Sequence, residues 1–295
     1  MKRVLITGIT GYVGSHLARA LLPNCHVCGL VREPLNTEYI EGIRDQLQLF
    51  FYDGSYESMR MAVKEAKPEL VYHLATYYTG SHRSADLPTL ISSNITMGAY
   101  LLEAMAANGI PALVYASSIT THYKGEAYCP LSLYAATKQA LSDLICYYSN
   151  IGLLRTVTLM LSDTYGPNDY RPKILNLIKD AVKSGKRLEL TDGRQDYDAV
   201  YIDDVVRAFK QAGELLLKKN EWTNETFQIC SPDPLSLRKT VEQLLEMNGL
   251  ALNAEWGKYA GTDRNVHKAV RLYPTVPGWK AEISLNEGLK AFMTN

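Results

Sequence analysis

The sequence predicts an α/β fold, a doubly wound parallel sheet with a smaller C-terminal cap. Two observations carry this prediction. Short apolar runs alternate with helix-like segments up to Leu161, which is the rhythm of strands joined by crossover helices. Beyond Gly166 and Pro167 that rhythm loosens into shorter pieces. We therefore expect residues 1–166 to form the sheet domain, segments from about 186–230 to return to it, and residues 167–295 to form mainly the cap.

Composition limits the partners. The chain has 295 residues and zero formal net charge, which gives no reason to expect nucleic acid or an anionic membrane as a partner. Because the N-terminus runs straight into an expected strand, we expect no signal peptide, and no apolar run reaches the ~18 residues of a membrane span. The five cysteines lack the spacing of a zinc site. We expect a cytoplasmic protein without a metal site.

A glycine-rich turn, Thr7 to Gly14, lies between the apolar run 4–6 and the helix-like run 15–22. Gly8 allows a tight turn, Gly11 lets a pyrophosphate approach the backbone, and Gly14 lets the helix pack closely on the strand. Free N–H groups and the positive end of the helix dipole then face the anion. The turn predicts a dinucleotide cofactor, contacted by Gly8, Thr10, Gly11, Tyr12, Val13 and Gly14.

The second strand, 26–31, ends at Val31 and is followed by Arg32. A site that prefers NAD places an acid here to bind the ribose 2′-hydroxyl, but the first acid in this chain is Glu33. The guanidinium of Arg32 could instead pair with a 2′-phosphate. The sequence therefore predicts NADP(H).

The other elements follow in order. We expect strands over 47–52, 70–75, 112–116 and 156–161, and helices over 56–66, 88–108 and 133–150. In the C-terminal part we expect helices over 173–184, 204–217, 236–248 and 285–292, with a short strand over 188–190. Asp203 and Ser236 are the residue types that cap helices. The strand that ends at Leu74 and Ala75 leads into a polar loop that carries Thr76 and Tyr77 and would overhang a ligand.

Tyr134 and Lys138 are four residues apart on an expected helix and share one face. A free phenol titrates near ~10. An ammonium about 4 Å away, at an effective dielectric of about 20, contributes roughly 4 kcal/mol, or about three pKa units. We expect Lys138 to lower the pKa of Tyr134 and make it a general acid or base.

Taken together, the motifs resemble the extended short-chain dehydrogenase/reductase family, with its nucleotide-sugar epimerases, dehydratases and 4-ketoreductases. The residues that carry the resemblance are Thr7-Gly8, Gly11, Gly14, Asp53, His73-Leu74-Ala75, Asn94, Ser117-Ser118, Tyr134, Lys138, Tyr165-Gly166-Pro167, Tyr201 to Val205, and Gly278-Trp279. The resemblance implies a Rossmann-type sheet, with Tyr134 as proton donor and Lys138 on the nicotinamide ribose. It also implies cofactor contacts from Asp53, Gly54, Leu74, Ala75 and Ser117, substrate contacts from Thr76 and Tyr77, and support of the site backbone by Asn94.

Departures from the family pattern leave some roles open. The position of the family's catalytic hydroxyl falls on Ile119, so Ser118 or Thr120 would have to orient the substrate carbonyl. Nothing acidic lies between Ser117 and Lys124, which argues against sugar dehydration. Two positions where many relatives carry arginine are Met160 and Tyr197 here, so Arg194 or Arg264 would contact the nucleotide diphosphate.

Three function classes follow. The first is NADPH-dependent reduction of a nucleotide-linked 4-keto-(6-deoxy)hexose; segments at 31–33 and 73–78 resemble reductases of the CDP-abequose synthase type, and Arg32 favours this class. The second is an NAD-dependent nucleotide-sugar 4-epimerase. The third is a cofactor-sensing protein without activity, which Tyr134 and Lys138 argue against.

The resemblance also implies a homodimer that pairs the helices over 88–108 and 133–150. Apolar side chains beyond those needed to cover one sheet face would form the contact: Ile91, Ile95, Tyr100, Met105, Leu141, Ile145 and Tyr148.

Overall fold

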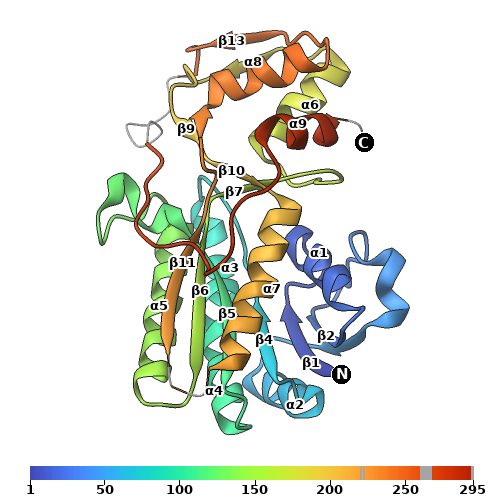
Figure 1. Ribbon diagram of the computed structural model, residues 1–295, viewed down its shortest axis with the longest axis vertical. Helices are drawn as coiled ribbons and strands as arrows, with labels where there is room; N and C mark the ends of the chain where they lie inside the picture. The colour runs from blue at the N-terminus through green and yellow to red at the C-terminus, as the bar shows by residue number, and fades with distance from the viewer. Residues whose placement is uncertain (220, 222, 260–267, 294–295) are drawn as a thin grey trace.

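The computed structural model describes residues 1–219, 221, 223–259 and 268–293. In this part of the chain a central sheet has seven strands in the order β11-β6-β5-β4-β1-β2-β3, and every neighbouring pair is parallel (Figure 1). The strands are β1 (Lys2–Thr7), β2 (Cys25–Val31), β3 (Gln48–Phe51), β4 (Leu70–His73), β5 (Ala112–Ser118), β6 (Arg155–Leu161) and β11 (Asn224–Ile229). The chain runs from β1 out to β3 and then returns to β4, so the strand order reverses between β1 and β4. The predicted doubly wound parallel sheet is confirmed.

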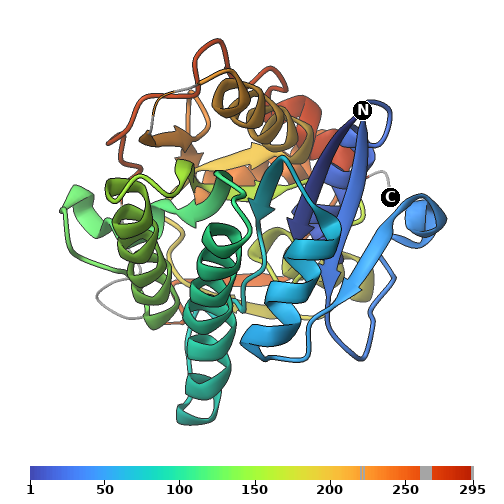
Figure 2. The same cartoon turned by 90° about the horizontal axis from the view of Figure 1, so that it is seen from below.

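Helices cover both faces of this sheet. One face carries α1 (Tyr12–Leu21) and α7 (Ile202–Lys218), which pack against each other. The other face carries α2 (Tyr56–Ala66), α4 (Met97–Ala107) and α5 (Leu133–Asn150), which stand in a row in Figure 2. Side chains of a strand alternate between the two cores, so Val4 and Ile6 of β1 face α1 and α7 while Leu5 faces α2 and α4.

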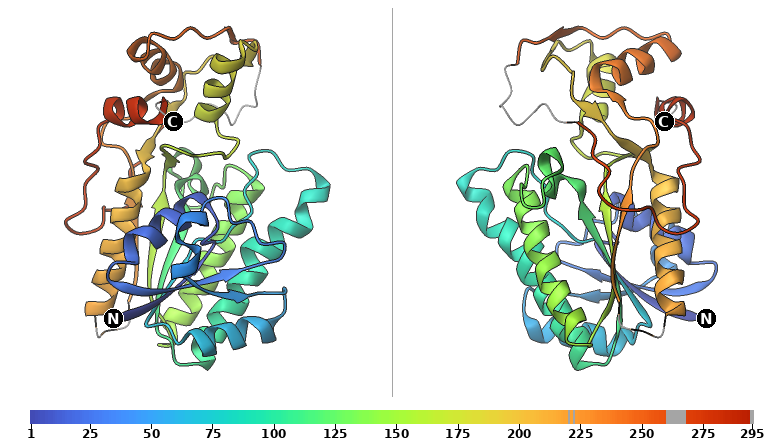
Figure 3. Two further views of the ribbon diagram at one scale, coloured as in Figure 1. Left: turned by 90° about the vertical axis from the view of Figure 1, so that its right-hand side faces the viewer. Right: turned by 60° about the vertical axis from the view of Figure 1, so that its left-hand side comes forward.

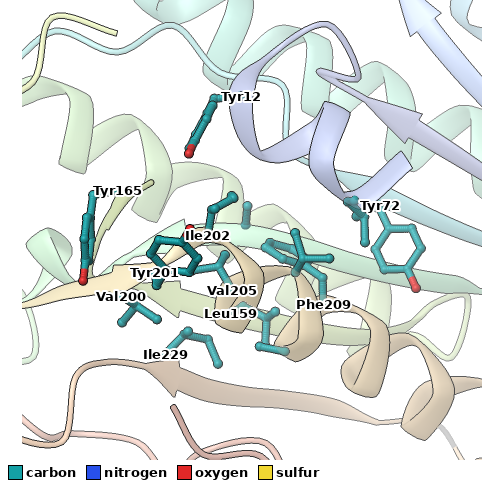
Figure 4. Close-up of a cluster of buried hydrophobic side chains, with 14 of the residues drawn as sticks. Tyr12, Tyr72, Leu159, Tyr165, Val200, Tyr201, Ile202, Val205, Phe209 and Ile229 are labelled. Atoms are coloured by element: carbon teal, nitrogen blue, oxygen red, sulfur yellow. The ribbon is translucent and has the colours of Figure 1, made fainter. Parts of the chain in front are cut away.

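The core beneath α7 is aromatic and aliphatic (Figure 4). Phe209 of α7 packs against Tyr72 of β4 with ring centroids 6.4 Å apart, and Leu159 and Ile229 extend the cluster to β6 and β11. This packing joins α7 to the middle of the sheet. The segment 202–229 therefore returns to the sheet after the chain has already left it.

The remaining elements gather beyond the ends of the strands, at the top of Figures 1 and 3. They are α6 (Ile174–Ser184), α8 (Leu237–Met247) and α9 (Leu285–Met293), with three two-stranded ladders. The ladders pair β7 (Asp163–Tyr165) with β10 (Ala199–Tyr201), β9 (Asp196–Tyr197) with β12 (Leu235–Ser236), and β8 (Leu188–Leu190) with β13 (Ala254–Trp256). Among the described residues, none of the helices is long and apolar enough to cross a membrane.

Several boundaries differ from the sequence prediction. The helix expected over 88–108 is divided into α3 (Leu87–Ile91), a π-helical turn η3 (Ser92–Thr96) and α4. Strand β11 was not predicted from its sequence, since its outer half is polar. Short 3₁₀ turns, also not predicted, occur at η1 (Glu41–Gln46), η2 (Ser84–Asp86), η4 (Ile119–Thr121) and η5 (Tyr123–Gly125).

The two predicted helix caps have different outcomes. Ser236 caps α8 as expected, because its side chain accepts from the backbone N–H of Lys239. Asp203 does not cap α7: the helix starts at Ile202, and Tyr201 occupies the cap position. Asp203 and Asp204 instead lie in the first turn, where the helix dipole favours carboxylates.

The apolar side chains assigned to a dimer face are only partly available. Met105, Leu141 and Ile145 are at most 1% exposed and belong to the core of the subunit, so that part of the expectation is wrong. Their side chains are needed to cover the sheet. The positions that reach the surface are Ile91, Ile95, Tyr100 and Tyr148.

Asp204 joins α7 to the C-terminal segment. Its fully buried carboxylate accepts from the backbone N–H groups of Glu282 and Ile283, each at 3.0 Å, and forms an ion pair with Arg207. The Trp279 indole N–H donates to the Asp204 carbonyl at 2.9 Å. One residue of α7 thus fixes the chain that leads to α9.

We expect Asp204→Ala to lower the free energy of unfolding by about 3–5 kcal/mol, because it leaves two backbone donors and Arg207 without their carboxylate. Urea denaturation followed by circular dichroism measures this. Asp203→Ala, which changes the exposed neighbour in the same turn, is the control and should cost less than about 1 kcal/mol. Equal losses of unfolding free energy in the two variants would contradict the role given to the Asp204 carboxylate.

Candidate active site

One large cavity, of about 1200 Å³, lies where the strands end. Its wall on the sheet side is made by residues that follow β1, β2, β4, β5 and β6, and its other wall by β8, β9 and the segment 268–270. The cavity spans the reversal of strand order between β1 and β4, where open α/β sheets bind ligands.

The glycine-rich turn forms one end of this cavity, and all six residues predicted there line it. Gly8 has a φ of +75°, and a Cβ on it would lie 2.7 Å from the backbone nitrogen of Ala75. A Cβ on Gly14 would lie 2.2 Å from the Gly8 carbonyl oxygen. Helix α1 starts at Tyr12 with no side-chain cap and no acid in its first turn. Its first N–H groups therefore suit an anion such as a pyrophosphate.

Arg32 follows directly on β2 and lines the same end of the cavity. Its Nη1 lies 3.3 Å from Ser93 Oγ. The neighbouring wall residues Pro34 and Asn36 carry no charge. Asp53 and Gly54 do not line the cavity, and the Asp53 carboxylate accepts from Ser58 Oγ at 2.7 Å.

Helix α5 places Tyr134 and Lys138 on the cavity wall. Ser132 caps the helix by accepting from the Ala135 N–H, which sets Tyr134 in the first turn and Lys138 one turn later. Lys138 is 2% exposed, and its Nζ lies 4.4 Å from the centre of the Tyr115 ring. The shared face predicted from their spacing is present.

The expected electrostatic effect of Lys138 on Tyr134 is absent. Burial raises the pKa of Tyr134 well above its ordinary value, and burial lowers the pKa of Lys138 to about 7. The prediction of a lowered Tyr134 pKa is therefore wrong for this structure, because burial of the phenol raises that pKa. At neutral pH Tyr134 keeps its proton.

Both candidate hydroxyls lie on the cavity wall. Ser118 ends β5, Thr120 lies in η4, and their side-chain oxygens are 2.8 Å apart. The backbone N–H of Thr120 also points to Ser118 Oγ at 3.3 Å. Ser117 lines the cavity as well, and which hydroxyl meets a substrate stays a prediction.

The segment after β4 contributes Leu74, Ala75, Thr76 and Tyr78 to the wall. The ring of Tyr78 packs edge-on against the ring of Tyr134, with centroids 5.0 Å apart. Tyr77 does not line the cavity, and its hydroxyl lies 3.3 Å from Asp86 Oδ1. His73 is buried behind the wall, where its Nδ1 pairs with Thr7 Oγ1 at 2.7 Å, as expected of a strand histidine.

The opposite wall holds charged residues that sequence reasoning did not select. Asp163 forms an ion pair with Lys173 and a hydrogen bond with Tyr197. Burial acts to raise the Asp163 pKa, but the combined effect of Lys173, Arg171 and the Tyr197 hydroxyl lowers that pKa. Arg171 lies 4.6 Å from the centre of the Tyr12 ring and pairs with Asp169 at 2.6 Å. The available signal was the position of Asp169, Arg171 and Lys173 just after the Tyr165-Gly166-Pro167 turn, with Asp163 just before it.

Of the two arginines predicted to bind a nucleotide diphosphate, only Arg194 lies in the described part of the chain. Arg194 does not line the cavity, and its guanidinium pairs with Asp192 at 2.5 Å. Arg264 lies outside the described residues. The described residues also hold no group of three side chains that could bind a metal ion.

Comparisons with known proteins agree with this geometry. The model of the NAD dependent epimerase/dehydratase family matches residues 4–230. CDP-abequose synthase from Yersinia pseudotuberculosis is 28% identical over 259 residues, covering 87% of this chain and 88% of that protein. UDP-glucose 4-epimerase from Mycolicibacterium smegmatis is 28% identical over 230 residues, covering 72% and 73%. The solved structure of MoeE5 in complex with UDP-glucuronic acid and NAD has a TM-score of 0.83 at 25% identity, covering 99% of this chain and 98% of that one.

The matched residues include the glycine-rich turn, the Tyr134–Lys138 pair and strands of the central sheet as far as β11. The chain belongs to the NAD dependent epimerase/dehydratase family, the extended short-chain dehydrogenase/reductases that its motifs resemble.

Proposed function

We propose that this protein uses NADPH to reduce the C4 keto group of a nucleotide-linked 4-keto-(6-deoxy)hexose. The observation that carries the proposal is Tyr134, a phenol on the cavity wall whose pKa is raised by burial. A reductase needs a proton donor at neutral pH, and a raised pKa keeps the phenol of Tyr134 protonated there. Similarity to CDP-abequose synthase supports this class of reaction.

The chain's residues divide the reaction between them. A nicotinamide cofactor bound at the glycine-rich turn would supply the hydride that converts the C4 carbonyl into an alkoxide. Tyr134 donates its hydroxyl proton to the alkoxide oxygen and regains a proton from solvent. Ser118 or Thr120 donates a hydrogen bond to the same oxygen, and Lys138 holds the nicotinamide ribose. The sugar becomes an alcohol and the cofactor is oxidised.

The substrate's nucleotide diphosphate would lie against the wall formed by residues 167–295, which we propose to be mainly a substrate-binding cap. Arg171, Lys173 and Lys268 bring cationic groups to this wall. Each already faces a carboxylate of the protein, namely Asp169, Asp163 and Asp196. Diphosphate binding would share these cations with their present partners.

A nucleotide-sugar 4-epimerase is the second candidate, favoured by the similarity to UDP-glucose 4-epimerase. There Tyr134 would first accept a proton and later return it. The two functions differ in one measurement. A reductase consumes NADPH in proportion to 4-keto sugar, whereas an epimerase interconverts UDP-glucose and UDP-galactose without net consumption of a cofactor. Turnover of the second kind alone would contradict the reductase.

Tyr134→Phe should lower kcat by about 10²–10⁴-fold, because the variant has no proton to donate, while NADPH affinity stays nearly unchanged. Steady-state kinetics and a cofactor titration measure both. Lys138→Ala should weaken cofactor binding, since Lys138 holds the nicotinamide ribose, and turnover should fall with it. Tyr128→Phe, which changes an exposed tyrosine of the neighbouring loop, is the control. Near-normal turnover in Tyr134→Phe would rule out the mechanism.

Ser118→Ala and Thr120→Ala, assayed in parallel, identify which hydroxyl donates a hydrogen bond to the substrate carbonyl: the variant with the larger fall in kcat has lost that donor.

Arg32→Ala should weaken NADPH binding by about 10–100-fold and leave NADH binding unchanged, because the substitution removes a charge-assisted contact with the 2′-phosphate. Fluorescence titration of both cofactors measures the preference. The control is Arg44→Ala, an exposed arginine of η1 that does not line the cavity. Equal binding of NADH and NADPH by the wild type would remove the basis for NADP(H), and a preference that survives Arg32→Ala would exclude Arg32 as its source.

We also propose a homodimer that pairs α4 and α5 of one subunit with those of another. The two helices lie side by side on one face; Tyr147 of α5 is 58% exposed, and Ile91 at the end of α3, which leads toward α4, is 39% exposed. Sedimentation equilibrium should give twice the 33.0 kDa chain mass. A single species at the chain mass, even at high concentration, would exclude the dimer.

A further inference from the structure

A closed set of hydrogen bonds surrounds Tyr134. The side chain of Thr76 is a hydrogen-bond partner of Tyr134 and acts to lower the pKa of its phenol, against the larger effect of burial. Thr76 Oγ1 donates to Asn94 Oδ1 at 3.0 Å. Asn94 Nδ2 donates to Thr137 Oγ1 at 2.9 Å, and the Thr137 hydroxyl donates to the Tyr134 carbonyl at 2.7 Å. Both ends of Tyr134, its phenol and its backbone, are thus tied to Asn94.

Asn94 cannot exchange its oxygen and nitrogen. It is 1% exposed and lies in the π-helical turn η3. Its Oδ1 accepts from the backbone N–H of Tyr77 at 2.7 Å, and its Nδ2 donates to the carbonyl of Tyr77 at 3.0 Å. A backbone N–H only donates and a carbonyl only accepts, so these two bonds fix the orientation of the amide. With Thr76 and Thr137, its two donors and two acceptor sites are all used.

This orientation fixes the direction of the next bond. Because Asn94 presents an oxygen to Thr76, the single hydroxyl hydrogen of Thr76 must point to Asn94. Toward Tyr134, Thr76 then has only lone pairs to offer. A protonated Tyr134 therefore donates to Thr76, and the hydrogen bonds run from Tyr134 through Thr76 to Asn94.

Loss of the phenolic proton of Tyr134 reverses the direction of its hydrogen bond with Thr76. A phenolate is acceptor-only, and the Thr76 hydroxyl can rotate about its Cβ–Oγ1 bond to donate to it. Asn94 Oδ1 keeps its bond from the Tyr77 N–H, so the buried amide is not left without a partner. No covalent bond to Thr76 changes, and its hydrogen stays on Oγ1.

We propose that Thr76 is a positioning residue for Tyr134: its hydroxyl accepts from the phenol before proton transfer and donates to the phenolate afterwards. The inference rests on the proposed function for its catalytic consequence. It gives Thr76 a different role from substrate binding. Without the Thr76 hydroxyl the buried phenolate would lose one of the two groups, Thr76 and Arg171, that partly offset the effect of burial on its pKa.

The test compares Thr76→Val, which removes the hydroxyl at nearly constant shape, with Thr76→Ser, which keeps it. Thr79→Val is the matched control, since Thr79 lies on the same segment and its hydroxyl donates to the Ser81 carbonyl at 3.0 Å. For Thr76→Val we expect a fall in kcat of about tenfold with KM changed less than about twofold. Thr76→Ser, which keeps the hydroxyl, should restore kcat. A rise in KM alone, or no change, would overturn the proposal.

A second measurement needs no substrate. The protein is labelled at tyrosine Cζ with an NMR-active carbon isotope, and the Tyr134 resonance is identified by its loss in Tyr134→Phe. It should shift in Thr76→Val and stay in place in Thr76→Ser and Thr79→Val. A shift without any turnover of 4-keto sugar would support the role of Thr76 and reject the reductase. An unshifted resonance would reject the role of Thr76 whatever the reaction is.

Discussion

The site depends on a backbone contact between two neighbouring strands. β1 and β4 lie side by side, and the turn after β1 passes so close to Ala75 after β4 that only a glycine fits at position 8. A second close approach, between Gly14 and the Gly8 carbonyl, sets the start of α1 over the same point. These two contacts bring the uncapped end of α1 beside the residues that follow β4. The anion-binding turn and the Thr76 segment therefore share one cavity wall.

Burial then decides the electrostatics of that wall. Tyr134 and Lys138 lie on the same face of α5, and both side chains lose hydration there. Burial therefore raises the pKa of Tyr134 and lowers the pKa of Lys138. His73, behind Tyr115, is also buried, and its pKa is lowered to about 3, first by burial and then by Lys138. The interior around Lys138 thus contains a neutral imidazole and a protonated phenol.

The second wall of the cavity is tied to the sheet from far along the chain. Gln228 of β11 donates to the Val270 carbonyl at 2.7 Å and accepts from the Leu272 N–H at 3.0 Å. Asp198 accepts from Arg271 and from the Ser231 N–H. Together with the buried carboxylate of Asp204, these bonds hold the C-terminal segment against the sheet. They are also the reason that cap residues such as Lys268 reach the cavity.

The sequence by itself determined the features with a local cause. The alternation of strands and helices predicted the sheet, the glycine spacing predicted the turn on the cavity wall, and the i,i+4 spacing placed Tyr134 and Lys138 on one face. Ser236 capped its helix because a cap involves only a few neighbouring residues. Each of these follows from periodicity or from contacts within one turn of chain.

Only the tertiary structure decided the rest, since it depends on residues far apart in the sequence. Whether Tyr77 or Tyr78 faces the cavity follows from the bonds that Asn94 makes to Tyr77, 17 residues along. The pKa of Tyr134 is raised because the folded chain buries the phenol. Met105 is unavailable for a dimer contact because its side chain is buried against the sheet beneath α4. Asp163, Lys173 and Tyr197 meet only after the cap has folded over the strand ends. Local pattern fixes which elements form and which way they face, whereas burial and charge at a site are sums over neighbours that only the folded chain brings together.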